Sequence, residues 1–347
     1  MNEPVKPELE PGAADGLAAA QSQPGPPHTL QTPVSQGLVQ GSVSGSDLGS
    51  SNNARPMTAG DYLPKLESQY CAEDAGEKII PSAFEFFNRH MGGWRSGLHI
   101  LAGEPGSGKT AFALCNAAAA ARQGFPVLFL SFDVQPELLV TKLLCQQARL
   151  NSREMMDGAL DADVVKAAMA AQAETFARIT LIEADPELPN EQAEDIARQL
   201  IAESERDRIL VVVDYLQIWA AGNRQFSEFR HEIAKLITAM RRLALSLDSP
   251  VLAVSSQNRQ HQGEAVLQSL EGTSDLEYSA DSVSFLINVE RPASQGSYTH
   301  PDDLISNSRT VSINLCKNRF GETASRMVKF LPSTGAFDEE TVRRPLV

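Results

Sequence analysis

The segment Gly103–Thr110 constrains the fold of this chain more than any other feature of its sequence. It reads GEPGSGKT and matches the pattern G-x-x-x-x-G-K-[ST] at every specified position. An apolar run precedes it, and an alanine-rich helical stretch follows it, which is the strand–loop–helix context that a phosphate-binding loop requires. Its three glycines let the backbone curl so that N–H groups point at phosphate oxygens. An ordinary glycine turn would need neither the lysine nor the threonine, so the segment predicts a nucleotide phosphate site.

Each position of this loop has an expected role. Lys109 would reach the β- and γ-phosphates, and the Thr110 hydroxyl would hold Mg²⁺. The amino end of the following helix adds the positive end of its dipole. The residues expected to bind the nucleotide are Gly103, Glu104, Pro105, Gly106, Ser107, Gly108, Lys109, Thr110 and Ala111.

Asp214 is the second expected metal-site residue. It ends the run ILVVVD, and an acid that follows a buried strand in this way can anchor Mg²⁺ as a Walker B carboxylate. An isolated Asp at a strand end is more often a turn or cap residue. Its position after a phosphate-binding loop favours the metal role. We therefore expect ATP and Mg²⁺ as cofactors, with Thr110 and Asp214 on the metal.

Apolar runs alternate with helical stretches from about residue 78 onward. Such alternation predicts an α/β fold, and almost wholly apolar runs indicate parallel strands that are covered on both faces. Polar residues mix into the last runs, which predicts antiparallel strands near the C-terminus. The expected strands are 98–103, 126–132, 179–184, 209–219, 250–257, 282–291, 309–319 and 325–337, and the expected helices are 110–124, 136–150, 190–206 and 227–247.

The first 60 residues differ in composition from the rest. They are rich in Pro, Gly, Ser and Gln and poor in aromatic residues, so they cannot bury enough apolar surface to offset the entropy of ordering. We expect a disordered tail over 1–60, acting either as a tether for a replication partner or as a solvated tail with no fixed role. Residues 61–77 are expected to be a linker with a short helix from about Pro64, and 78–347 the ATPase domain.

Charge and composition limit the classes of function. The net charge is −14, which counts mildly against nucleic-acid binding, although a ring with a narrow basic lining can be acidic overall. The four cysteines form no metal-binding pattern, which favours a reducing cytosol. No apolar run approaches the roughly 20 residues that span a bilayer, and no secretion signal is visible. A cytoplasmic protein with no membrane partner is expected.

Several stretches in the right order resemble one family. Residues from about 80 to 340 resemble the ATPase domain of DnaB-type replicative helicases, within the RecA-like group. The similar stretches are MGGWRSGLHILAGEPGSGKTAFAL before and through the loop, DYLQ at Asp214, PVLAVSSQNR, LEGTSDLEYSADSVSFL with Ala280 and Asp281, and KNRFG at residues 317–321. The ordered set is far more specific than any single motif.

The resemblance implies a RecA-like P-loop NTPase core and a homo-oligomeric ring, expected to be a hexamer, with ATP bound between subunits. It implies that Lys317 and Arg319 serve the ATP of the neighbouring subunit. A cation from outside can neutralise charge on the transferred phosphoryl group and so couple hydrolysis to the interface. From the spacing alone, the pair could equally be a solvated basic strand end.

The chain departs from the family pattern at three places. Where the family has a catalytic Glu, this chain has Asp133, whose shorter carboxylate we still expect to act as the base. Glu137 is the alternative, although a Glu at a helix start more often complements the dipole. The γ-phosphate-sensing Gln is matched by Ser256, with Gln257 one residue later, a shift that reverses the side of a strand. Either the strand end is locally shifted, which would let Gln257 bind the nucleotide as we expect, or the sensor is altered. The first 60 residues cannot be the family's N-terminal helical domain, which makes primase recruitment in the usual manner doubtful.

Two loops correspond to the family's channel-facing loops, residues 220–226 and 259–275. The first offers Arg224 and the second Arg259 and His261 as contacts for single-stranded DNA. The second loop also contains Glu264 and Glu271, which would repel phosphate. We therefore expect weak, salt-sensitive binding.

Three functions remain open from the sequence. The first is a ring-forming, ATP-hydrolysing helicase or helicase-like translocase that acts on single-stranded DNA in replication. The second is a RecA-superfamily ATPase that works in recombination or regulation without unwinding. The third is an ATP-dependent assembly module with slow turnover, suggested by Asp133 and the acidic charge.

Overall fold

A computed structural model describes residues 58–71, 79–221, 229–257, 264–270, 278–289 and 308–339. All of them belong to the second of the two units into which the chain divides, Met57–Val347. The described part is built on a nine-stranded sheet of order β3-β2-β4-β5-β1-β6-β7-β8-β9. Its strands are β1 (Gly97–Gly103), β2 (Val127–Ser131), β3 (Ile179–Glu183), β4 (Leu210–Asp214), β5 (Pro250–Ser256), β6 (Ser282–Asn288), β7 (Arg309–Asn318), β8 (Ala324–Leu331) and β9 (Ala336–Asp338).

The pairing of the strands changes once across this sheet, from parallel to antiparallel. The strands from β3 through β6 pair in parallel, and β6, β7, β8 and β9 pair antiparallel. The expected mostly parallel α/β sheet with antiparallel C-terminal strands is therefore confirmed. No helix in the described ranges is both long enough and apolar enough to cross a bilayer.

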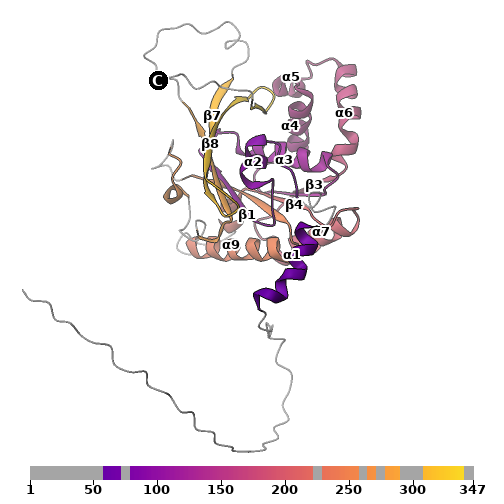
Figure 1. Ribbon diagram of the computed structural model, residues 1–347. Helices are drawn as coiled ribbons and strands as arrows, with labels where there is room; N and C mark the ends of the chain where they lie inside the picture. The colour runs from indigo at the N-terminus through magenta and orange to yellow at the C-terminus, as the bar shows by residue number, and fades with distance from the viewer. Residues whose placement is uncertain are drawn as a thin grey trace, which may run out of the picture. The chain divides into compact units, whose positions relative to one another are not determined.

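Helices cover both faces of the sheet (Figure 1). One face packs against α3 and α4, and the other against α7 and α9. The helices are α1 (Leu63–Tyr70), α2 (Glu85–Met91), α3 (Lys109–Arg122), α4 (Pro136–Ala148), α5 (Ser152–Met156), α6 (Ala162–Phe176), α7 (Asn190–Ala202), α8 (Leu216–Ala221) and α9 (Phe229–Ser246), with short 3₁₀ turns at Ala59–Tyr62 and Leu267–Ser269.

The two cores follow from the alternation of side chains along each strand. In β4, Leu210 and Val212 join the core under α3, whereas Val211 and Val213 join the core under α9. Every second residue of a strand faces the same side, so Asp214 continues the row of Leu210 and Val212. Asp214 thus emerges on the α3 side, at the end of the strand.

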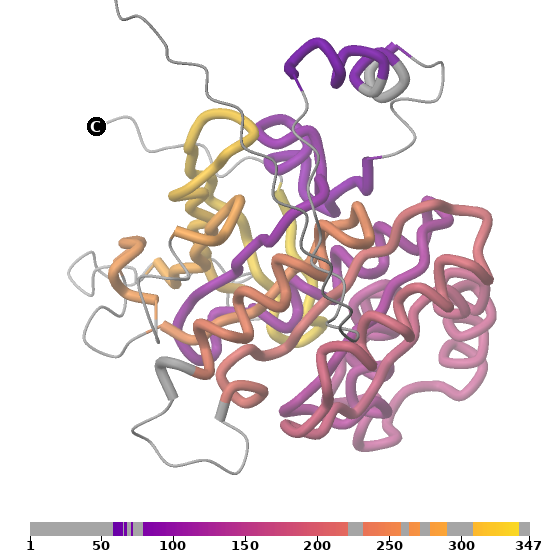
Figure 2. Tube along the Cα trace, turned by 90° about the horizontal axis from the view of Figure 1, so that it is seen from below, coloured from indigo at the N-terminus to yellow at the C-terminus, as the bar shows by residue number. Residues whose placement is uncertain are grey.

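The segment before β1 packs against the C-terminal strands, although about 250 residues separate them. Figure 2 shows the two segments side by side, in purple and yellow. Glu339 accepts hydrogen bonds from the Glu85 N–H at 2.7 Å and from the Phe86 N–H at 3.1 Å, which caps the amino end of α2. The Phe84 ring packs edge-on against Phe337.

Several expected element boundaries were wrong. The strand expected over 209–219 ends at Asp214 and gives way to α8, because Leu216, Trp219 and Ala220 repeat at helical spacing and bury their side chains in one core. The strand expected over 325–337 is two strands, separated by a turn in which Gly335 has a φ of 71°. Helices α2, α5 and α6 were not predicted from the sequence. The helix expected from about Pro64 is α1, with Pro64 in its first turn.

Candidate nucleotide-binding site

A pocket of about 500 Å³ lies at the carboxyl ends of β1, β4 and β5. Ligands of open α/β sheets bind at this edge, where strands deliver side chains and helices begin. Of the nine loop residues expected to bind nucleotide, six line the pocket, namely Pro105, Gly106, Gly108, Lys109, Thr110 and Ala111. Gly103, Glu104 and Ser107 lie behind this wall.

Two glycines of the loop are required by close packing. A Cβ on Gly103 would lie 2.6 Å from the Leu286 carbonyl oxygen, so no side chain fits there. Gly108 has a φ of 95°, and a Cβ on it would lie 3.0 Å from the Phe337 ring. The loop is thereby held tightly against β6 and β9.

Gly106 has the opposite surroundings. Its φ is 78°, and a Cβ placed on it would meet no atom of the described residues within 4 Å. The space that the loop encloses is therefore open on the pocket side. The next residue, Ser107, is fully buried, and its hydroxyl oxygen has no hydrogen-bond partner within the part of the chain that the structure describes. An open cradle with a polar lining is the shape that a phosphate group fits.

The Lys109 ammonium folds into the same loop. Its Nζ donates to the carbonyl oxygens of Gly103 at 2.8 Å and Glu104 at 2.9 Å. Burial lowers the pKa of Lys109, while the charges of Asp214 and Glu104 oppose that shift. The lysine is therefore held where a phosphate oxygen could replace the two carbonyls.

Thr110 and Asp214 meet across the start of α3 and the end of β4. Asp214 is only 3% exposed, and the Thr110 side chain lies close enough to its carboxylate to influence its pKa. Burial raises the pKa of Asp214; Thr110 and Lys109 oppose the shift, and the charge of Asp133 adds to it. A hydroxyl and a buried carboxylate are oxygen ligands of the kind that Mg²⁺ takes. The residues present therefore fit a magnesium ion.

Asp133 lies on the pocket wall and is exposed. The turn that carries it is held by Ser131, whose hydroxyl donates to the Val134 carbonyl at 2.6 Å. Lys142 of α4 lies on the same wall, and its charge acts on Asp214. Lys142 was not among the residues predicted from the sequence. Its position three residues after Leu139, on the side of α4 that turns toward the core, was the available signal.

One wall of the pocket is apolar and comes from parts of the chain distant in sequence. Phe330 and Pro332 line it with Leu114, and a Cβ on Gly108 of the loop would lie 3.3 Å from the Phe330 ring. Gln146 ties this wall together, because its amide donates to the carbonyls of Ala111 at 2.8 Å and Gly335 at 2.6 Å. An apolar wall next to a phosphate loop suits a nucleotide base. Phe330, Pro332, Leu114 and Gln146 were not predicted from the sequence.

The end of β5 presents Ser256, rather than Gln257, to the pocket. Gln257 is 3% exposed and points to the other side, where its amide donates to the Glu264 carbonyl at 2.6 Å and the Ser269 hydroxyl at 3.0 Å. The structure thus does not bring Gln257 to the nucleotide residues. The alternation of side chains along a strand is the reason.

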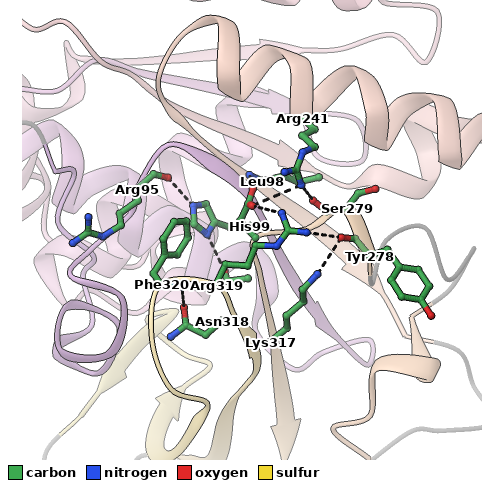
Figure 3. A network of polar contacts seen from close by, with 12 residues as sticks. Arg95, Leu98, His99, Arg241, Tyr278, Ser279, Lys317, Asn318, Arg319 and Phe320 are labelled. Carbon is green, nitrogen blue, oxygen red and sulfur yellow. Dashed lines mark hydrogen bonds and ion pairs between the residues drawn. The ribbon is translucent and has the colours of Figure 1, made fainter. Parts of the chain in front are cut away.

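Lys317 and Arg319 lie at the opposite end of β1 from the pocket. Lys317 pairs in register with Val283 near the start of β6, which runs parallel to β1. Arg319 bonds to Asp281, whose carboxylate also accepts from the Leu98 N–H (Figure 3). Leu98 and Gly103 are five strand residues apart, roughly 17 Å at the usual rise. The two cations therefore do not reach the pocket of their own chain.

The expected DNA contacts Arg224, Arg259 and His261 lie outside the described residues. Of the acids that flank them in sequence, Glu264 is described, and its carbonyl accepts the bond from Gln257.

Comparisons with known proteins agree with this geometry. Residues 79–339 match the model of the DnaB-like helicase C terminal domain. A Replicative DNA helicase DnaB from Geobacillus stearothermophilus is 28% identical over 268 residues, which cover 74% of this chain and 56% of that protein. The chain thus spans about half the length of this relative.

Two solved structures share the fold. One is a DnaB-like replicative helicase, described with its interactions with primase, at a TM-score of 0.65 and 20% identity, covering 83% of this chain and 68% of that one. The other is an ATPase domain at a TM-score of 0.68 and 20% identity, covering 83% of this chain and 100% of that one. With the family model matching from before β1 to the end of β9, the chain belongs to the DnaB-like helicase C-terminal domain family.

Proposed function

We propose that this chain is an ATP-hydrolysing motor of a ring-forming DNA helicase that acts on single-stranded DNA in replication. One observation carries the proposal. The groups that suit a magnesium nucleotide gather at the carboxyl end of β1, while the cations Lys317 and Arg319 lie at its amino end. One subunit therefore presents a pocket on one side and cations on another, as a site shared between neighbours requires.

ATP fits the pocket in a defined direction. Its phosphates would lie in the loop around Gly106, within reach of Lys109, and its base would lie against Phe330 and Pro332. Thr110 and Asp214 would hold Mg²⁺, which neutralises charge on the phosphate oxygens when bound. Asp133 would orient and deprotonate the attacking water, and Lys142 would add positive charge beside it.

The ring follows from the placement of the cations. A contact that joins one surface of a subunit to a different surface of the next closes into a ring when the rotation permits. We propose a homo-hexamer in which Lys317 and Arg319 act on the neighbour's nucleotide. Single-stranded DNA would pass through its channel against Arg224, Arg259 and His261.

The domain boundaries form part of the proposal. The ATPase domain would occupy 78–347, and α1 would lie in a linker over 61–77. Residues 1–60 would contact a replication partner. The similarity to a replicative DNA helicase from Geobacillus stearothermophilus supports the assignment to replication.

The decisive experiment measures ATP hydrolysis by the full chain with and without single-stranded DNA at low salt. Stimulation by DNA, with a ring-sized mass in the presence of a non-hydrolysable nucleotide, is expected. Arg319→Ala should abolish hydrolysis while nucleotide binding survives, and Lys109→Ala should abolish both. Release of a labelled strand from a forked duplex separates a helicase from an ATPase that does not unwind. Unstimulated turnover near background, with nucleotide-driven assembly, would instead favour the assembly module.

A further inference from the structure

The Asp281 carboxylate joins the strand that carries the phosphate loop to the cation Arg319. One carboxylate oxygen accepts from the Leu98 N–H of β1 at 2.9 Å. The other accepts from Arg319 Nη1 at 2.8 Å (Figure 3). The Asp281 side chain is 13% exposed, against 42% for Arg319. A nearly buried acid therefore holds a largely exposed cation.

The carboxylate has little freedom to move. A Cβ on Gly97 would lie 2.6 Å from its Oδ2, so the acid is packed directly against the β1 backbone. The Asp281 N–H donates to the Leu98 carbonyl at 2.7 Å, and the Arg319 N–H donates to the Asp281 carbonyl at 2.9 Å. Both the backbone and the guanidinium of Arg319 are thus fixed by the same residue.

Two neighbouring carbonyls complete the arrangement. The Tyr278 carbonyl accepts from Arg319 Nη2 at 3.0 Å and from Lys317 Nζ at 3.2 Å. The Ser279 carbonyl accepts from Arg241 of α9, whose Nη1 also lies 3.7 Å from Asp281 Oδ1. The short segment 278–281 therefore orients both cations and is itself tied to α9.

Arg319 keeps donors for another partner while it is held. A guanidinium carries five N–H donors in a fixed plane, and these two side-chain bonds use one on each terminal nitrogen. The other three donors have no partner among the described residues, on a side chain that is 42% exposed. These contacts orient the guanidinium plane and leave N–H donors available for a group on another subunit.

We propose that Asp281 is the positioning residue of Arg319: it aims the guanidinium at the nucleotide of the neighbouring subunit and does not touch that nucleotide. This inference rests on the proposed role of Arg319 in the neighbour's site. The opposite arrangement would have Asp281 restrain Arg319 and so oppose hydrolysis.

The test compares full-length Asp281→Asn with Arg319→Ala. Asn keeps the size and an oxygen for the Leu98 N–H but removes the charge that holds Arg319. The kcat should fall about 10- to 100-fold, since displacing a catalytic group by about 1 Å has effects of this size. The KM for ATP should stay within about twofold, because Arg319 would act on the transition state. Asp281→Ser, which also removes the charge without placing an amide NH₂ beside Arg319, should behave alike.

Two controls separate positioning from a general loss of structure. Asp248→Asn removes a carboxylate that pairs with Arg208 at 2.6 Å, at the end of the sheet opposite the pocket, and should leave kcat unchanged. The double variant Asp281→Asn with Arg319→Ala should be no slower than Arg319→Ala alone, because Asp281 acts through Arg319. Additive losses, or a kcat that rises in Asp281→Asn, would overturn the inference.

Subunit mixing tests the direction of action. Lys109→Ala subunits have an inactive nucleotide site but a correctly positioned Arg319. Asp281→Asn subunits have an intact nucleotide site but an Arg319 that is no longer held in position. Equal mixing creates intact sites at about a quarter of the interfaces of a head-to-tail ring, so activity should rise well above that of either variant. An equal mixture of Arg319→Ala and Lys109→Ala subunits is the reference. If activity recovers only in this reference mixture, the role of Asp281 is refuted and the proposed function stands. If activity recovers in neither mixture, the proposed shared site itself is refuted.

Discussion

The main-chain N–H of Ser256 donates to the Gln217 side-chain oxygen at 3.0 Å, while the Gln217 amide donates to the Ser255 hydroxyl at 2.7 Å. Gln217 belongs to α8, three residues after the metal-site residue Asp214, and Ser256 lines the pocket. One buried side chain therefore fixes the end of β5 relative to the end of β4.

Gln217→Ala should destabilise the fold and slow ATP hydrolysis. The substitution removes the acceptor of the Ser256 N–H and the donor to the Ser255 hydroxyl. A buried polar group that is left without its partner costs about 1–3 kcal/mol. We expect the free energy of unfolding in urea to fall by about 2 kcal/mol or more, with a lower kcat because Ser256 shifts in the pocket. The matched control is Gln199→Ala, which removes an exposed amide bonded to Glu203 at 2.8 Å. Equal stability of the two variants would contradict the prediction.

Gly106→Ala should remove nucleotide binding at a modest loss of stability. Gly106 and Gly158 both have positive φ, 78° and 65°, and neither would place a Cβ within 4 Å of another atom. Both alanine variants should therefore lose a similar free energy of unfolding, about 1–2 kcal/mol for a left-handed residue. Only Gly106→Ala puts a methyl group into the phosphate space. Titration with a fluorescent ATP analogue checks this, and normal affinity in Gly106→Ala would exclude the assigned phosphate position.

Asp214→Asn should raise the melting temperature of the nucleotide-free protein at pH 7.5. Burial raises the pKa of Asp214, so the folded state holds this proton more tightly than the unfolded state. The carboxyl therefore contributes stability below its unfolded pKa and loses it as the pH rises through its folded pKa. The uncharged Asn does not lose this stability. The difference in melting temperature between Asp214→Asn and the wild type should therefore shrink as the pH is lowered and Asp214 becomes protonated.

Glu194→Gln is the control for this prediction, because its effect on stability should change with pH in the opposite direction. The hydrogen bond from Arg198 lowers the pKa of Glu194, so its contribution is present above its unfolded pKa and lost as the pH falls through its folded pKa. Thermal unfolding at pH 7.5 and at lower pH should show Glu194→Gln destabilised only at the higher pH. A melting temperature of Asp214→Asn below that of the wild type at pH 7.5 would argue against this account of the Asp214 charge.

Asp133→Glu should raise the rate of ATP hydrolysis. The additional methylene brings the carboxylate closer to a water at the γ-phosphate, at the position where the family has Glu. Asp133→Asn should lower kcat about 100-fold, at the lower end of what a general base contributes. Glu137→Gln is the control, because Glu137 is exposed in the first turn of α4 and does not line the pocket. Unchanged kcat in both Asp133 variants would remove Asp133 from the reaction.

The phosphate loop, the acid at the end of β4 and the change from parallel to antiparallel pairing could all be predicted from the sequence. Each depends on residues that are close in the chain: glycines at fixed spacing, an apolar run that ends in Asp214, and polar residues that enter the last strands. Local backbone preference and the alternation of buried side chains determine such features. The same local reasoning extended the β4 strand too far, because an apolar run such as YLQIW suits a helix as well as a strand.

Only the tertiary structure decided which distant residues meet. Phe330 and Pro332 line the pocket because of the place that β8 takes, next to the edge strand β9, in a sheet whose strand order cannot be predicted from local sequence. Ser256 faces the pocket and Gln257 faces away because register sets the side of each strand residue. Asp281 binds Arg319 because β6 and β7 pair in one particular register. These contacts depend on packing between segments far apart in the chain, which a pattern of neighbouring residues cannot predict.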